Sequence, residues 1–69
     1  MIQPGPYQHY KGNFYEVFTT ATHTETEEEM VLYKAKGKDQ FWVRPLSMFG
    51  ENVEKDGKTV PRFKYMGEI

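Results

Sequence analysis

The strongest structural signal in this sequence is the run at residues 14–22, which is rich in aromatic and β-branched side chains. Its residues alternate between two faces, and aromatic side chains occur on both. This pattern is typical of a strand that is covered on one face and partly covered on the other. No segment of the chain has the hydrophobic period of a helix of three turns. The fold must therefore be built mainly from strands.

Shorter extended segments, separated by turn residues, continue this pattern along the chain. Further strands are expected at residues 7–10, 30–36, 41–44, 52–54, 59–60 and 62–65. Glycine, asparagine and aspartate supply turns at residues 11–13, 37–39 and 55–58. Between Pro45 and Gly50, a proline near the start and a glycine past the end predict one helical turn over Leu46 to Phe49. The sequence thus predicts an all-β, mainly antiparallel fold, a small barrel or a strongly bent sheet, with one short helical turn.

A chain of 69 residues has room for one hydrophobic core. Residues 1–69 are therefore predicted to form a single small β-barrel domain, with residues 1–6 extended or frayed. Five Phe, five Tyr and one Trp must supply much of the apolar area. The residues expected in the core are Tyr15, Val17, Val31, Tyr33, Trp42, Leu46, Phe49 and Phe63.

Composition excludes several classes of function. The chain has no cysteine, which rules out disulfides, thiolate catalysis and cysteine-ligated metals. No apolar run is long enough to span a membrane or forms a signal peptide, so we expect a cytoplasmic protein without a membrane partner. The net charge of −1 makes nucleic acid an unfavoured partner. With His9 and His23 as the only histidines, neither a metal nor a cofactor is expected.

Assembly depends on the edges of the predicted sheet. Residues 7–10 or 60–65 would lie at an open edge, and a small domain gains apolar burial from a dimer. Lys58, Arg62 and Lys64 on the last segment work against edge pairing. We therefore predict a monomer and keep a dimer as the alternative.

The segment His23-Thr24-Glu25 is the first candidate for chemistry. In an extended segment, residues two apart share a face, so the imidazole and the carboxylate would point the same way. Such a pair is typical of a general acid–base site. The alternative is a loop histidine that caps backbone groups, with Glu25 in water. The sequence favours this second interpretation, because no other catalytic motif accompanies the pair.

The two arginines are candidates for binding an anion. Arg44 precedes Pro45 and Arg62 follows Pro61, so the backbone near both guanidinium groups is restricted. A guanidinium group binds carboxylate or phosphate through paired hydrogen bonds. The alternative is that each arginine pairs with a glutamate of the same domain. Both interpretations stay open at this point.

Aromatic side chains suggest a further alternative, a cage for a cationic ligand. Its members would be Tyr10, Tyr15, Tyr33, Trp42 and Tyr65. The core competes for the same rings, since little else in the chain can fill it.

Several short motifs stand in a fixed order along nearly the whole chain. They are Tyr10-Lys11-Gly12, residues 21–26 (Ala-Thr-His-Thr-Glu-Thr), Val31-x-Tyr33, Trp42-Val43-Arg44-Pro45 with Phe49, and Pro61-Arg62-Phe63. In this the chain resembles a small bacterial family catalogued as domain of unknown function 1653. The resemblance implies a small barrel of the SH3-like type and no established activity. Its polar motif residues include His23, Glu25, Thr26, Arg44 and Arg62.

Two hypotheses for function follow. The favoured one is a non-enzymatic binding module that recognises an anionic group or a protein partner. Its ligand-binding residues would be His23, Glu25, Thr26, Trp42, Arg44 and Arg62, gathered where residues 23–26 meet the two arginines. The alternative is a small hydrolase or transferase, with His23 and Glu25 as the acid–base pair and Arg44 as the anion anchor.

Overall fold

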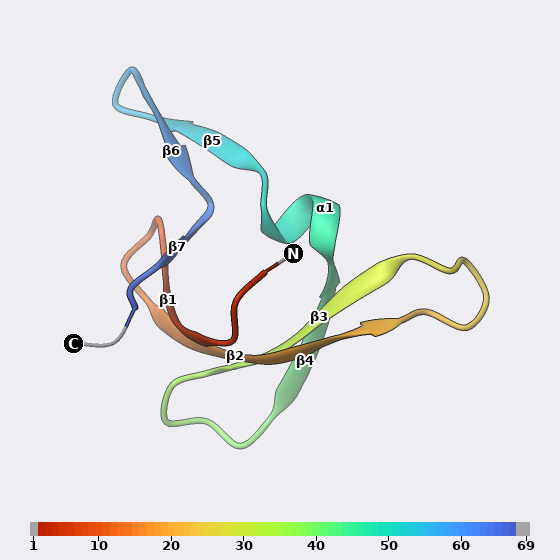
Figure 1. Ribbon diagram of the computed structural model, residues 1–69. Coiled ribbons are helices and arrows are strands. Elements are labelled where there is room, and N and C mark those ends of the chain that lie inside the picture. The colour runs from red at the N-terminus through yellow and green to blue at the C-terminus, as the bar shows by residue number, and fades with distance from the viewer. Residues whose placement is uncertain (1, 68–69) are drawn as a thin grey trace.

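The computed structural model describes residues 2–67, which form seven strands and one helical turn (Figure 1). The strands are β1 (Gly5–His9), β2 (Phe14–Thr22), β3 (Glu29–Ala35), β4 (Phe41–Pro45), β5 (Asn52–Lys55), β6 (Lys58–Pro61) and β7 (Phe63–Tyr65), and the helical turn is α1 (Leu46–Phe49). Every strand pair is antiparallel. The predicted all-β, antiparallel fold with one helical turn is confirmed, and β2 has the predicted bounds.

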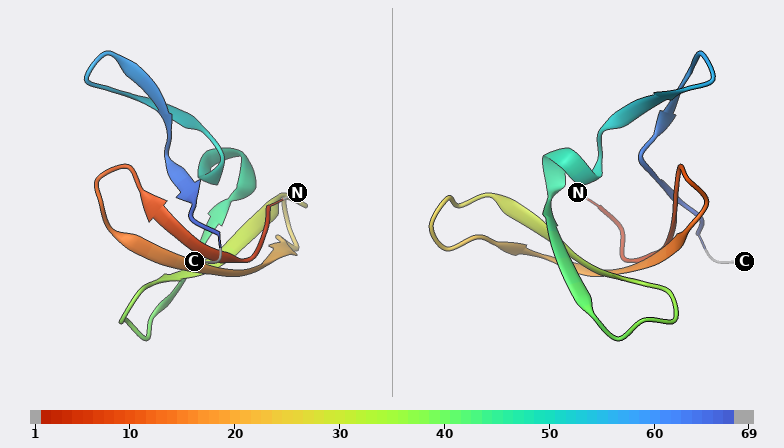
Figure 2. Two further views of the ribbon diagram at one scale, coloured as in Figure 1. Left: turned by 60° about the vertical axis from the view of Figure 1, so that its left-hand side comes forward. Right: turned by 180° about the vertical axis from the view of Figure 1, so that it is seen from behind.

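Five strands form one bent sheet in the order β4-β3-β2-β1-β7. The remaining strands, β5 and β6, form a separate hairpin above it, as Figures 1 and 2 show. Within the described residues no strand pairing joins β4 to β7, so the sheet has two open edges and is not closed into a barrel. The SH3-like barrel therefore stays a prediction.

A bulge in β2 bends the sheet. The register of β2 against β3 shifts between Val17 and Thr19, which leaves Phe18 without a partner on β3. Such an extra residue kinks a strand and increases its twist. Phe18 packs against Phe41 of β4 on the outer face, with ring centroids 5.4 Å apart. The ammonium group of Lys34 lies 5.9 Å from the centroid of each ring.

The core lies on the concave face of the sheet and is mostly aromatic. Its buried residues are Tyr7, Val17, Val31, Tyr33, Phe49 and Phe63, and Ile2, Tyr15 and Leu46 pack against them partly buried. The helical turn places Phe49 in the middle, stacked on Phe63 at 4.1 Å and edge-on to Tyr7 and Tyr33. The predicted core is confirmed for seven of these residues, whereas Tyr7 was not predicted.

The prediction that Trp42 belongs to the core is wrong. Its side chain is 48% exposed. Trp42 pairs with Tyr33 on the concave face, but β4 is an edge strand without a neighbour on its far side. Phe49 and Phe63 fill the concave face further along, and the described part of the chain covers only about half of Trp42.

The N-terminal segment is extended and attached to the sheet. Gly5 and Pro6 are the first residues of β1, and the Tyr7 hydroxyl donates a hydrogen bond to the carbonyl of Gln3 at 2.7 Å. Met1 of the segment predicted as extended or frayed lies outside the described residues, as do positions 68–69 of the predicted domain. No helix between residues 2 and 67 is long and apolar enough to cross a membrane.

Candidate anion-binding site

The end of the β2–β3 hairpin holds the first predicted site residues. The Nδ1 atom of His23 accepts hydrogen bonds from the backbone N–H groups of Glu25 and Thr26, at 3.1 and 3.3 Å. The Thr26 hydroxyl bonds to the Glu28 carboxylate at 3.2 Å, and the side chain of Glu25 is exposed. His23 is thus a loop histidine that caps backbone groups, which is the second of the two interpretations given for it in the sequence analysis. Its ring makes no hydrogen bond to the Glu25 carboxylate in the described structure.

Arg44 lies at the open side of the bent sheet. It pairs with Val31 on the concave face, and its Nε donates a hydrogen bond to the Tyr33 hydroxyl at 3.2 Å. Its guanidinium carbon lies 6.0 Å from the centroid of Phe63 in β7. The side chain therefore crosses the opening between the two edge strands. No carboxylate within residues 2–67 forms a salt bridge with it.

Arg62 pairs with a glutamate of the same chain. Its Nη2 lies 2.7 Å from the Glu51 carboxylate, with the two side chains 24% and 45% exposed. Its backbone N–H donates to the Glu51 carbonyl, and its own carbonyl accepts from the N–H of Tyr10, both at 3.0 Å. For Arg62, the interpretation as a structural ion pair describes the observed contact. Its Nε is buried and has no partner in the described structure.

The predicted residues are not all brought together. Figures 1 and 2 show the end of the β2–β3 hairpin, residues 23–28, projecting away from β7 and the β5–β6 hairpin. Arg62 immediately precedes β7 and contacts Tyr10 and Glu51, so it lies on the other side of the molecule. Trp42 is exposed at the edge of the sheet, on the same face as Arg44.

The histidine that lies near both arginines is His9. Its ring packs edge-on against Phe63 at 4.9 Å and lies 4.6 Å from the ring of Tyr10. Burial lowers the pKa of His9, and the positive charges of Arg62, Lys11 and Arg44 lower this pKa further. The sequence analysis missed His9 because it lies near the N-terminus. The available signal was its spacing of two from Tyr7 in a strand, which places both on one face.

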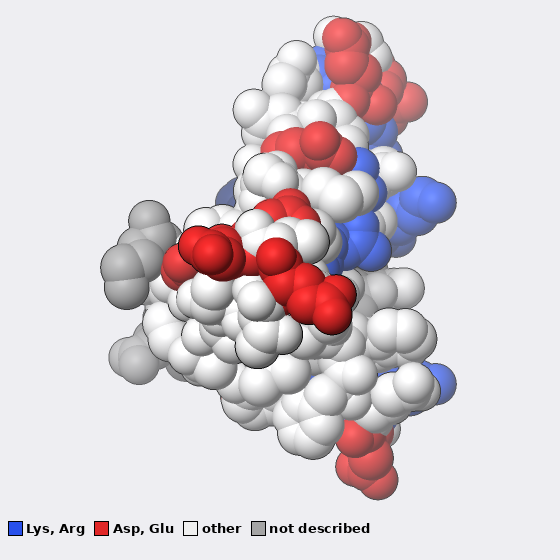
Figure 3. Space-filling model, turned by 90° about the vertical axis from the view of Figure 1, so that its right-hand side faces the viewer, with Lys and Arg blue, Asp and Glu red and all other residues white. Residues whose placement is uncertain are grey.

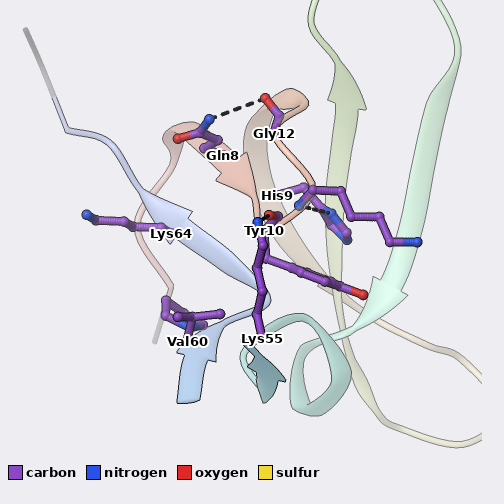
Figure 4. Close-up of a pocket in the computed structure, with 9 residues that line it drawn as sticks. Gln8, His9, Tyr10, Gly12, Lys55, Val60 and Lys64 are labelled. Carbon is purple, nitrogen blue, oxygen red and sulfur yellow. Dashed lines mark hydrogen bonds between the residues drawn. The ribbon is translucent and has the colours of Figure 1, made fainter. Parts of the chain in front are cut away.

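A surface pocket of about 460 Å³ lies beside His9, between the β1–β2 turn and the β5–β6 hairpin (Figure 4). We call it the lysine pocket; it is lined by Gln8, His9, Tyr10, Lys11, Gly12, Lys55, Val60, Pro61 and Lys64. The Lys55 ammonium reaches from β5 to the Tyr10 carbonyl and donates a hydrogen bond of 3.0 Å. Lys64 also lines the pocket, and in Figure 4 its side chain extends from β7 in the direction away from Lys55 and Tyr10. No carboxylate lines this pocket among the described residues.

The two signs of charge are separated along the chain. Residues 17–33 contain four glutamates and no lysine or arginine. The rest of the chain, with nine basic and six acidic residues, therefore carries +3 although the whole chain carries −1. In Figure 3, acidic side chains lie at the centre of the face toward the viewer and also at its top and bottom, and basic side chains lie mostly along the right flank. The lysine pocket belongs to the positively charged part.

The aromatic cage that the sequence left as an alternative is not assembled among the described residues. Tyr15 contacts Tyr33, whereas Tyr65 packs against Tyr7 and Trp42 makes no ring contact within residues 2–67. The described residues also contain no group of three or more His, Asp or Glu side chains that would hold a metal ion.

Comparison with known proteins identifies the family. The model of the family described as "Protein of unknown function (DUF1653)" matches residues 5–65. The chain belongs to the DUF1653 family. A crystal structure of a DUF1653 member from Bordetella bronchiseptica is similar to it, with 32% sequence identity and a TM-score of 0.88. The match covers 99% of this chain and 91% of that one. No curated protein matches this chain. The resemblance predicted from the ordered motifs is thereby confirmed, and DUF1653 membership leaves the activity open.

Proposed function

We propose that this DUF1653 protein is a non-enzymatic binding module that recognises an anionic group in the lysine pocket. The observation that carries the proposal is the composition of the lining. Lys11, Lys55 and Lys64 come from three different elements, and His9 adds a titratable ring, while no carboxylate lines the pocket in the described structure. An anion would therefore enter without displacing an internal carboxylate.

The lysine ammonium groups at the pocket are held in place to different degrees. Lys55 is held by its hydrogen bond to the Tyr10 carbonyl, so one ammonium group has a fixed place at the pocket. The Lys11 ammonium lies 5.9 Å from the centroid of the Tyr10 ring. Ammonium groups act as compact point charges, which suits the oxygens of a phosphate or a carboxylate. Val60 and Pro61 supply an apolar wall for the group that carries the anion.

His9 would report on the bound anion. The Nδ1 atom of its neutral ring accepts the backbone N–H of Lys11 at 3.2 Å. Nearby cations lower the pKa of His9 by repelling its protonated form. A bound anion opposes that repulsion, so binding raises the pKa of His9. A rise in the pKa of His9 therefore distinguishes an anion bound in the pocket from one bound elsewhere on the protein.

The enzyme alternative has less support. It requires His23 and Glu25 to act as a pair beside Arg44, but the His23 Nδ1 is occupied by backbone N–H groups. Arg44 points toward Tyr33 and Phe63 instead. Loops at the strand ends of this bent sheet are positions where small domains carry binding residues.

The test is an NMR titration of the labelled protein with sodium phosphate and, separately, sodium citrate at constant ionic strength. We expect amide shifts at Lys11, Gly12 and Lys64 and a higher pKa for the His9 ring. Lys11→Ala and Lys64→Ala should each weaken anion binding several-fold, because each removes one of the few positive charges that line the pocket and that contribute similarly to binding.

The matched control is Lys38→Ala, which removes the same charge from an exposed turn between β3 and β4. It should leave the affinity unchanged. If Lys38→Ala weakened anion binding equally, the loss of affinity in the other variants would reflect the net charge of the protein and not the pocket. Shifts confined to residues 23–26, or none with either anion, would refute the proposed site.

A further inference from the structure

Edge strand β4 exposes three consecutive large apolar side chains. Phe41 is 57% exposed, Trp42 48% and Val43 60%. An apolar edge strand readily pairs with another chain, and proteins usually protect such edges with lysine, a bulge or a covering loop. The other edge, β7, is only three residues long and carries Lys64 at its centre. β4 carries no lysine, aspartate or glutamate, and its one charged residue and its proline, Arg44 and Pro45, lie at its C-terminal end.

The backbone of β4 is open on one side. β4 pairs only with β3, in a register that runs from Met30 opposite Pro45 to Lys34 opposite Phe41. For residues 41–44, none of the N–H or C=O groups takes part in a hydrogen bond outside that ladder in the described structure, and Pro45 at the end of the strand is the N-cap of α1. The side of the ladder that faces away from β3 is therefore free to accept another strand.

The sequence of β4 is complementary to itself in antiparallel orientation. Residues directly opposite each other in an antiparallel pair point to the same face of the sheet. A two-fold axis perpendicular to the sheet must therefore pass midway between one residue and the same residue of the second copy, so that this residue pairs with its own counterpart. With Val43 on the axis, Trp42 lies opposite the Arg44 of a second copy on one face. Phe41 then lies opposite its Pro45 on the other face.

We propose that a second copy of this chain binds along β4, so that two five-stranded sheets join into one continuous sheet. In this register each Arg44 lies opposite a Trp42 rather than another arginine, and its guanidinium reaches that indole by leaving the Tyr33 hydroxyl to which it is bonded in the single chain. A guanidinium over an indole is the most favourable of the cation–π pairs. The opposite face covers Phe41 and Val43, the two most exposed large apolar residues of the described structure.

The contact is small, which sets the expected affinity. One five-residue strand on each side falls near the low end of the area range for specific interfaces, about 1,000 Å² in total. The dimer should therefore be weak, with a dissociation constant in the range of tens to hundreds of micromolar. This inference revises the predicted monomer, because the sheet has a second open edge, β4, besides the edge strand β7 that carries Lys64. It does not depend on the lysine pocket.

Sedimentation velocity between about 10 and 500 µM tests the proposal. The weight-average mass should rise toward that of a dimer, and the emission of Trp42, the single tryptophan, should shift to the blue over the same range. Val43→Lys places two ammonium groups on the axis and should abolish both changes. The control is Phe14→Lys, since Phe14 is also exposed (47%) but lies in the interior strand β2.

Cross-linking gives a second readout that does not require a tight dimer. The chain has no cysteine, so Val43→Cys carries a single thiol. Paired Cα atoms on the axis are about 4.5–5.5 Å apart, within the range of a disulfide. Val43→Cys should form a disulfide dimer under mild oxidation, and Phe14→Cys should not. A monomer at 500 µM, an unchanged dimer in Val43→Lys, or equal cross-linking of both cysteines would each overturn the proposal.

Discussion

Replacing Phe49 by alanine tests whether one helical turn closes the core of this small protein. Phe49 is 1% exposed and contacts the rings of Tyr7, Tyr33 and Phe63. Removing a buried phenylalanine costs about 3–5 kcal/mol. At about 0.05–0.15 kcal/mol per residue, the whole domain has about 3–10 kcal/mol of stability. Phe49→Ala should therefore leave much of the population unfolded without denaturant.

The milder change Phe49→Leu keeps most of the apolar volume but loses the ring contacts, at a cost of about 1–2 kcal/mol. With a urea m-value near 1 kcal/mol/M, its unfolding midpoint should fall by about 1–2 M. Trp42 fluorescence monitors both transitions. The control is Met48→Ala in the same helical turn, where a 45% exposed side chain should cost about 0.5 kcal/mol or less. This account of the core would be refuted if Phe49→Ala kept the urea midpoint of the unsubstituted protein. It would also be refuted if Met48→Ala lost as much stability as the Phe49 variants.

Three further predictions concern polar residues. The folded pKa of His9 lies below its unfolded value of about 6.5, so the free energy of unfolding should fall as the pH drops below about 6.5 through the folded pKa. His9→Gln should flatten this dependence in urea melts between about pH 5.5 and 8. Arg62→Ala should lower the free energy of unfolding by about 1 kcal/mol, since its pair with Glu51 is partly exposed; a loss of 3–5 kcal/mol would mean a buried pair. His23→Ala should cost about 0.5–1.5 kcal/mol and leave anion titrations unchanged, which binding at residues 23–26 would contradict.

Local signals predicted most of the strands and turns. In the turn between β5 and β6, Asp56 and Gly57 both have positive φ, 53° and 77°, which is the conformation that Asp-Gly sequences favour in tight hairpins. Alternation placed Val17, Val31 and Tyr33 on one face. These features depend only on neighbours in the sequence, so the sequence was sufficient to find them.

The order of the strands could not be predicted in this way. Strand alternation correctly placed Trp42 and Arg44 on one face, but the burial of that face depends on what lies beside β4. No strand does, and Trp42 is exposed for that reason. The sequence analysis grouped His23 with Arg62 for the same reason. Both residues lie near strand ends, and alternation does not say which strand ends meet. In the structure these two lie apart. Long-range pairing brought His9 to the arginines instead.

Net charge was a poor guide to partners for a related physical reason. The value of −1 averages a hairpin with four glutamates and a body that carries +3. Charges separated by more than a Debye length, about 8 Å at physiological ionic strength, are largely screened from each other. The molecule extends 38 Å along its longest axis, so the hairpin glutamates do little to cancel the potential at the lysine pocket. An anionic ligand would respond to the local potential of Lys11, Lys55 and Lys64, and its affinity should fall as salt is added.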